Sequence, residues 1–219
     1  MHDRRAFLKA TAITGAGITL GPASALAANC TIGPPPHVEG PHVWMNMDQV
    51  ELDAAYDQSF YAPLLRRIIK RYASSSDATR ARLGEPKRVN YGPTPVEGLD
   101  IFTAKKPNAP VFVFIHGGAW RSGAAKDYAF PAEMFVNAGA HYVVLDFSSV
   151  DAANGDIAVM ADQVRRAIVW THKNAASFGG DANRLYIGGH SSGGHLCGVA
   201  LTTDWQAFGA PADMIKGGL

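Results

Sequence analysis

The sequence predicts an α/β fold with a mostly parallel sheet covered by helices on both faces. Three apolar runs, at residues 111–115, 141–147 and 184–187, have the length and composition of buried strands. Helical patterns separate these runs, and a glycine-rich motif follows the first and the third. This alternation is typical of a parallel sheet with crossover helices. With 219 residues and 47% apolar content, the chain can form one domain with a sizeable core.

Residues 1–27 are expected to be an export signal rather than part of the fold. Arg4 and Arg5 begin the segment RRAFLK, which resembles the twin-arginine signal, and residues 25–27 form a small-x-small cleavage site. We therefore expect a periplasmic or secreted protein with no membrane span in the mature chain. The net charge of +1 favours neither nucleic acid nor an anionic membrane surface as a partner.

Three further segments are expected after the signal. Residues 28–46 form a proline-rich arm. Residues 47–84 form a helical segment, in which Pro63 starts or kinks the second part and a basic cluster makes a solvated face. Because this segment precedes the sheet and carries aromatic residues, it is a candidate cap over the mouth of the site. Residues 85–219 form the core domain.

The core domain is expected to begin with an antiparallel strand pair at residues 87–91 and 99–104, because a short link rich in proline and glycine joins them. The apolar strands described above follow. The remaining elements expected are helices at 127–138, 157–178 and 194–202, and the start of a further strand at 214–219.

Residues 189–193 (GHSSG) form a G-x-S-x-G pattern between an expected strand and an expected helix. Such a strand-to-helix turn lifts the serine above the sheet edge, where a base can reach it. Because the turn is tight, the residues two before and two after the serine must be small. Ser191 is therefore the candidate nucleophile, and the helix N-terminus beside it favours developing negative charge.

Residues 116–120 (HGGAW) follow the first apolar strand and form a candidate oxyanion loop. Glycines let the backbone approach a substrate carbonyl, and preorganised N–H groups there stabilise the oxyanion of acyl transfer. We assign the donors to the backbone N–H groups of Gly117, Gly118 and Ser192. His116 is interpreted as a structural residue that fixes the loop, because a base must approach the serine from the opposite side.

The order of these two motifs resembles the α/β-hydrolase superfamily, and within it the esterase/lipase group with an HGG oxyanion loop. HGGAW also resembles the HGGxW loop of kynurenine formamidase-like hydrolases, and residues 178–181 (FGGD) fit that family's approach to the serine turn. The resemblance covers about residues 85–219. It implies a serine hydrolase that forms an acyl-enzyme on a small ester or amide substrate, with no cofactor. Residues 146–149 (DFSS) depart from the tyrosine-arginine pair that many such esterases carry.

The resemblance also implies an acid and a histidine that follow the nucleophile in the chain. His195 lies one helical turn after Ser191 and is expected to be a core or helix-packing histidine, and no cluster of metal ligands is apparent. Asp146 precedes the nucleophile and is interpreted as a structural turn residue. We therefore expect a C-terminally truncated hydrolase with impaired turnover. A carboxylesterase, an arylformamidase-type amide hydrolase and a non-catalytic binding protein remain alternatives, and the oligomeric state stays open.

Overall fold

The structure is a computed structural model that describes residues 38–219. It contains two compact units, of which the first ends at Asp57 and the second runs from Gln58 to Leu219. The expected export signal at residues 1–27 lies outside the described residues, as does the proline-rich arm up to residue 37.

The described part of the first unit contains one helix, α1 (Gln49–Tyr56). Asp48 caps its N-terminus, because the Asp48 carboxylate accepts a hydrogen bond from the backbone N–H of Glu51 at 2.9 Å. The Glu51 carboxylate in turn accepts from the Asp48 N–H at 3.1 Å. This reciprocal capping box explains why the helix begins at this point of the expected helical segment.

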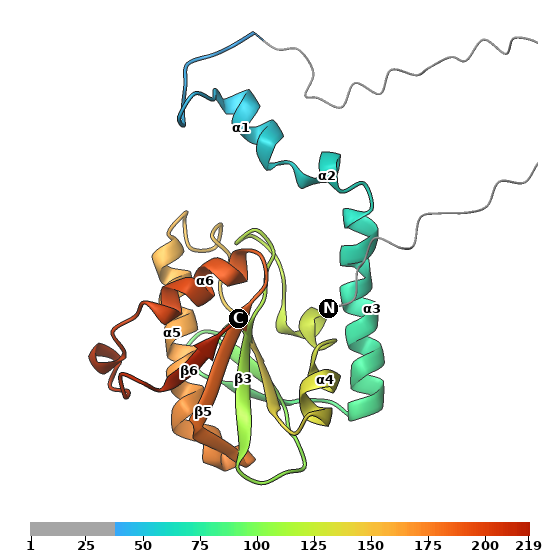
Figure 1. The fold of residues 1–219 in the computed structure, drawn as a ribbon, viewed down its shortest axis with the longest axis vertical. Helices are drawn as coiled ribbons and strands as arrows, with labels where there is room; N and C mark the ends of the chain where they lie inside the picture. Colours follow the sequence, from blue (N-terminus) through green and yellow to red (C-terminus); the bar gives the residue numbers. More distant parts are fainter. Residues whose placement is uncertain (1–37) are drawn as a thin grey trace, which may run out of the picture. The chain divides into compact units, whose positions relative to one another are not determined.

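The second unit is built on a six-stranded sheet with the order β1-β2-β4-β3-β5-β6 (Figure 1). The first two pairings in this order are antiparallel and the other three are parallel, which confirms the mostly parallel sheet. The strands are β1 (Lys87–Asn90), β2 (Gly98–Phe102), β3 (Ala109–Ile115), β4 (His141–Leu145), β5 (Gly180–Gly189) and β6 (Ile215–Gly218).

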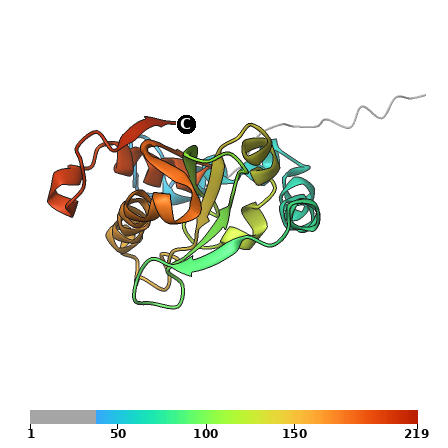
Figure 2. The ribbon, with the colours of Figure 1, turned by 90° about the horizontal axis from the view of Figure 1, so that it is seen from below.

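Helices cover both faces of this sheet, as Figures 1 and 2 show. On one face, α5 (Ile157–Asn174) and α6 (Ser192–Leu201) pack against the sheet through a core that includes Val164, Ile168 and Leu196. On the other face, α3 (Leu65–Leu83) packs along the short helix η1 (Ala125–Tyr128) and α4 (Ala132–Asn137). Short helices α2 (Gln58–Tyr61), η2 (Ala175–Phe178) and η3 (Trp205–Phe208) complete the chain.

The largest departure from the sequence-based expectation lies at residues 127–138. A single helix was expected there, but the structure has η1, a turn, and then α4, which starts only after Pro131. Proline has no N–H to continue a helix that precedes it, so Pro131 serves as the N-cap of a new helix.

Among residues 38–219, no helix combines the length and the apolar character needed to cross a bilayer.

A buried carboxylate joins the β1–β2 connection to α5. The side chain of Glu97 is fully buried, and it accepts hydrogen bonds from the Thr94 hydroxyl at 2.7 Å and from Arg166 Nε at 2.9 Å. Burial alone would raise the pKa of Glu97. The hydrogen bonds from Thr94 and Arg166 prevail, and the pKa is lowered from its ordinary value.

This lowered pKa predicts how the variant Glu97→Gln responds to pH. At pH 7 we expect it to lose about 1–3 kcal/mol of unfolding free energy, because the hydrogen bonds of Thr94 and Arg166 lose their charged acceptor. The contribution of a carboxylate with a lowered pKa is present above its ordinary pKa and is lost as the pH falls through the folded-state value. The difference in unfolding free energy between Glu97→Gln and wild type, measured by urea denaturation, should therefore shrink below about pH 4.

Glu133→Gln provides the matched control, because Glu133 also pairs with an arginine, Arg82, but at the surface. Exposed ion pairs contribute little to stability, so this variant should lose less than Glu97→Gln at pH 7. Equal losses for the two variants would contradict the assignment of Glu97 as a structural carboxylate.

Candidate functional site

The candidate site lies where the chain leaves the carboxyl ends of β3 and β5. These two strands are neighbours in the sheet and run parallel. The connection after β3 leads to η1 and α4 on one face, whereas the connection after β5 leads to α6 on the opposite face. In open α/β sheets, ligands bind beyond the carboxyl ends of the strands where loops diverge in this way.

Ser191 occupies a strained backbone turn between β5 and α6. Its φ of 55° and ψ of −122° are unfavourable for a residue with a side chain. The glycines on either side have no room for a side chain, because a Cβ on Gly189 would collide with the Gly193 carbonyl and one on Gly193 with the Ile115 carbonyl. The expected steric need for small residues at these positions is therefore confirmed, and Ser191 is exposed.

The candidate oxyanion loop lies directly against this turn. A Cβ built on Gly117 would stand 2.7 Å from the His190 carbonyl oxygen and 3.0 Å from Ser191 Cβ. Only a glycine allows the loop backbone to come this close to the serine. The structure thus brings together two motifs that are far apart in the chain.

The three amides assigned as oxyanion donors are unpaired within the described chain. Among residues 38–219, the N–H groups of Gly117, Gly118 and Ser192 donate to no backbone or side-chain acceptor. Ser192 is the first residue of α6, so its N–H belongs to the unpaired first turn of that helix. Three free donors at one strand-to-helix junction are suited to stabilising a negative charge.

His116 fixes the conformation of the loop through one hydrogen bond and two ring contacts. Its Nδ1 donates to the Gly117 carbonyl at 2.8 Å, and its ring stacks on Phe147 at 4.4 Å and on Tyr128 at 5.3 Å. In a trans peptide the N–H points opposite to the carbonyl, so this bond turns the Gly118 N–H away from His116. Burial lowers the pKa of His116, which keeps the ring neutral. These contacts agree with a structural role.

The same loop carries consecutive left-handed residues, with φ values of 131° at Gly118, 53° at Ala119 and 61° at Trp120. Two contacts hold this conformation: the Trp120 carbonyl accepts from Val150 N–H at 2.7 Å, and Trp120 Nε1 donates to His195 Nδ1 at 3.4 Å. The expectation that His195 packs in the core is wrong, because His195 is exposed and contacts the loop.

An aromatic group borders the serine turn on the side of α3. Tyr72 lies edge-on to the His190 ring at 6.0 Å and packs against Phe130 at 5.0 Å, while Tyr128 lies 6.4 Å from His190. No motif in the sequence points to these residues, because no motif spacing connects α3, η1 and the turn after β5. The aromatic residues come together only when the strands pair and the helices pack on the sheet.

Three further titratable residues follow Ser191 in the chain. Asp204 caps η3 by accepting from Gln206 N–H at 3.1 Å, and Asp213 pairs with Lys216 at 2.8 Å. Cys197 is buried and unpaired in α6, and burial raises the pKa of its thiol. Over residues 38–219, no group of three or more His, Cys, Asp or Glu side chains is arranged to hold a metal ion.

Two adjacent glycines of α6 are expected to respond in opposite ways to replacement by alanine. Gly193→Ala should reduce the unfolding free energy by about 3 kcal/mol or prevent folding, because its Cβ has no space beside Ile115. Gly194→Ala should be neutral or stabilising by about 0.5–1 kcal/mol, because its Cβ meets only an ordinary contact at 3.5 Å and alanine favours a helix. Thermal and chemical denaturation measure both, and a tolerated Gly193→Ala would contradict the turn geometry.

Comparison with known proteins shows the family of this chain. The BD-FAE family model matches residues 99–212, which is more than half of the chain. Kynurenine formamidase of Danio rerio is 30% identical over 173 residues, which cover 75% of this chain and 57% of that protein. Esterase LipC of Mycobacterium tuberculosis is 36% identical over 123 residues, which cover 53% of this chain and 30% of that protein.

A solved structure supports the fold assignment. The crystal structure of a putative thioesterase from Silicibacter sp. TM1040 matches with a TM-score of 0.61 at 24% identity, covering 69% of this chain and 55% of that chain. The kynurenine formamidases of Danio rerio and Salmo salar are matched over 57% and 60% of their lengths. The chain therefore has the α/β-hydrolase fold and belongs to the esterase-like BD-FAE family.

Proposed function

We propose that this protein is a serine hydrolase that cleaves carboxylic esters through an acyl-enzyme on Ser191. The observation that carries the proposal is the close approach of the loop with the free amides to the serine turn, where a Cβ added to Gly117 would stand only 3.0 Å from Ser191 Cβ. The Ser191 hydroxyl attacks the substrate carbonyl, and the N–H groups of Gly117, Gly118 and Ser192 stabilise the oxyanion. The leaving alcohol departs, and water then releases the acid.

The general base is proposed to lie outside the described residues. In residues 38–219, no histidine nitrogen forms a hydrogen bond with the Ser191 hydroxyl, and His116 is enclosed by aromatic rings. The curated relatives are longer than the segment matched here, so they have further sequence that could carry a base and its acid. Because an oxyanion hole without its base retains part of the catalysis, we expect residues 38–219 alone to hydrolyse esters slowly.

Labelling with a fluorophosphonate probe tests the nucleophile directly. Wild-type protein should become labelled on Ser191, as located by mass spectrometry of the modified peptide, and Ser191→Ala should abolish both labelling and the hydrolysis of p-nitrophenyl acetate. Ser74→Ala is the matched control, because Ser74 is an exposed serine that bonds only to the Arg71 carbonyl of its own helix. If wild-type protein is not labelled, a hydrolase-fold protein that binds without catalysis becomes the better assignment.

A second candidate activity is hydrolysis of an aryl formamide. It is favoured by two curated relatives named kynurenine formamidase and by the aromatic group of Tyr72, Tyr128 and Phe130 beside the serine turn. With wild-type protein and Ser191→Ala, kcat/KM for N-formylkynurenine can be compared with kcat/KM for a short p-nitrophenyl ester. A higher value for the formamide would replace the ester assignment while keeping Ser191 as nucleophile.

We further propose that the protein is exported through the twin-arginine signal at residues 1–27. The support is the segment RRAFLK and the small-residue cleavage site in the sequence. The double variant Arg4→Lys/Arg5→Lys should retain the chain in the cytoplasm, whereas the single exposed change Lys216→Arg in the folded domain should leave export unchanged. Cell fractionation measures both, and export of the double variant would contradict this route.

A further inference from the structure

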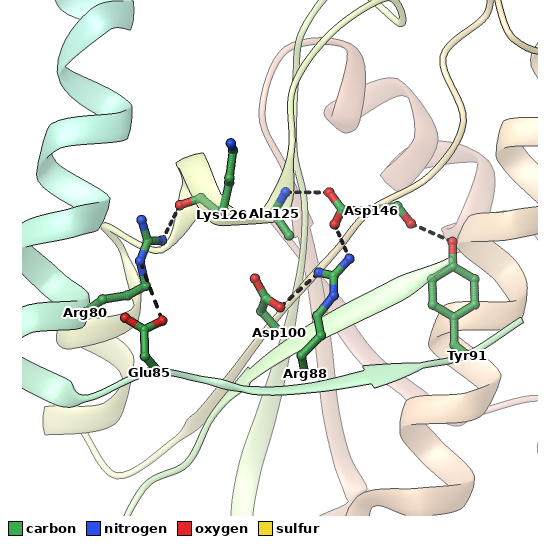
Figure 3. A network of polar contacts seen from close by, with 8 residues as sticks. All are labelled: Arg80, Glu85, Arg88, Tyr91, Asp100, Ala125, Lys126 and Asp146. Atoms are coloured by element: carbon green, nitrogen blue, oxygen red, sulfur yellow. Dashed lines mark hydrogen bonds and ion pairs between the residues drawn. The ribbon is translucent and has the colours of Figure 1, made fainter. Parts of the chain in front are cut away.

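Asp146, at the carboxyl end of β4, has contacts that the proposed chemistry does not use. Its backbone N–H donates to the Gly98 carbonyl at 2.9 Å, and its carbonyl accepts from the Tyr91 hydroxyl at 2.6 Å. Its carboxylate accepts from Arg88 Nη2 at 2.5 Å and from the backbone N–H of Ala125 at 2.6 Å (Figure 3). One residue thus joins β1, β2, the β1–β2 connection and η1.

Arg88 fixes the direction of this carboxylate. Its Nη1 donates to Asp100 at 2.9 Å, so the guanidinium lies between two acidic side chains, as Figure 3 shows. Burial works to lower the pKa of Arg88, but the hydrogen bonds to Asp100 and Asp146 outweigh it and raise the pKa. Gly98 makes room for the guanidinium, because a Cβ there would collide with it. Arg88 therefore stays charged and in place.

Ala125 closes the segment that contains the oxyanion loop. This segment, residues 116–125, starts at the end of β3 and returns at Ala125, which is fully buried. Two residues earlier, a Cβ on Gly123 would stand 2.5 Å from both the Gly117 carbonyl oxygen and His116 Nδ1. The returning chain therefore touches the Gly117 carbonyl, and Gly117 itself lies against His190 and Ser191, so a shift at Ala125 can be transmitted to Gly117 by direct contact.

We propose that the Arg88–Asp146 pair is a positioning couple for the candidate oxyanion loop: by binding the Ala125 N–H, it holds residues 116–125 in the conformation that brings Gly117 against Ser191. Asp146 and Arg88 do not touch the substrate. Their effect on the chemistry passes through the backbone of Ala125 and Gly123. The part of this inference that concerns reactivity rests on the proposed function, whereas the part that concerns the loop conformation does not.

Two variants of Asp146 separate the roles of its carboxylate. Asp146→Ala removes the acceptor of the buried Ala125 N–H, and so it should raise amide hydrogen exchange of the peptide 116–125 by about tenfold or more. Asp146→Asn retains an oxygen that can accept from Ala125 and loses only the charged bond to Arg88. It should therefore give an intermediate value and provides a second variant if Asp146→Ala folds poorly.

Asp181→Ala is the matched control, because the Asp181 carboxylate also accepts from an arginine, Arg184 at 2.8 Å, and from a backbone N–H, that of Asn183 at 2.9 Å. Asp181 lies near the start of β5, at the opposite end of that strand from Ser191. The control variant should leave exchange at residues 116–125 and labelling of Ser191 within about twofold of wild type, since it lies far from the loop.

The rate of fluorophosphonate labelling supplies the second measurement. Asp146→Ala should lower the maximal labelling rate of Ser191 by about tenfold or more, because a displaced donor no longer stabilises the charge that develops on the probe. The half-saturating probe concentration should change by less than about threefold, since the positioning couple does not contact the probe. A general loss of stability would instead raise amide exchange across the whole sheet in both Asp146→Ala and Asp146→Asn.

The two measurements distinguish failure of the positioning couple from failure of the proposed function. Unchanged exchange at residues 116–125 in Asp146→Ala overturns the positioning couple, whatever the labelling. Faster exchange with an unchanged labelling rate also overturns it, because Asp146 would then hold the loop without affecting the site. If wild-type Ser191 is not labelled at all, the proposed function fails, and the exchange measurement alone still decides whether Asp146 holds the loop.

Discussion

The site depends on a close approach of two backbones, one at the end of β3 and the other at the turn after β5. Gly193 lies against the Ile115 carbonyl, and Gly117 lies against His190 and Ser191. Neither contact could form with a side chain at the glycine. The unfavourable dihedral angles of Ser191 are sustained because β3 and β5 pair in register up to Ile115 and Gly189, so the sheet fixes both ends of the junction.

Much of this arrangement could be predicted from the sequence because it depends on local signals. The apolar runs that form β3, β4 and β5 are short and bounded by glycine or polar residues, and each motif directly follows its strand. The antiparallel pairing of β1 with β2 also followed from their short connection. In each case the determinant lies within a few residues of the element, and steric rules for glycine and proline are sufficient.

The interactions that support the site could not be predicted in the same way, because they join residues that are distant in the chain. Arg88 meets Asp146 only when β1 and β2 add to the edge of the parallel strands, and Tyr72 meets His190 only when α3 packs on that face. His195 was expected to be buried from its helical position, yet it is exposed beside Trp120, since helical periodicity does not reveal which loop crosses the helix end. Pro131 divided a segment whose apolar pattern alone favoured one helix.

The strand order also has a consequence for how the protein folds. β3 and β5 are adjacent in the sheet, but β4 and α5 lie between them in the chain, so the serine turn cannot receive its neighbours until a long stretch of polypeptide has been ordered. Closing such a loop costs chain entropy before the stabilising contacts form, and topologies of this kind fold slowly. The strained turn at residue 191 is thus expected to form late in folding, once β3 and β5 have paired.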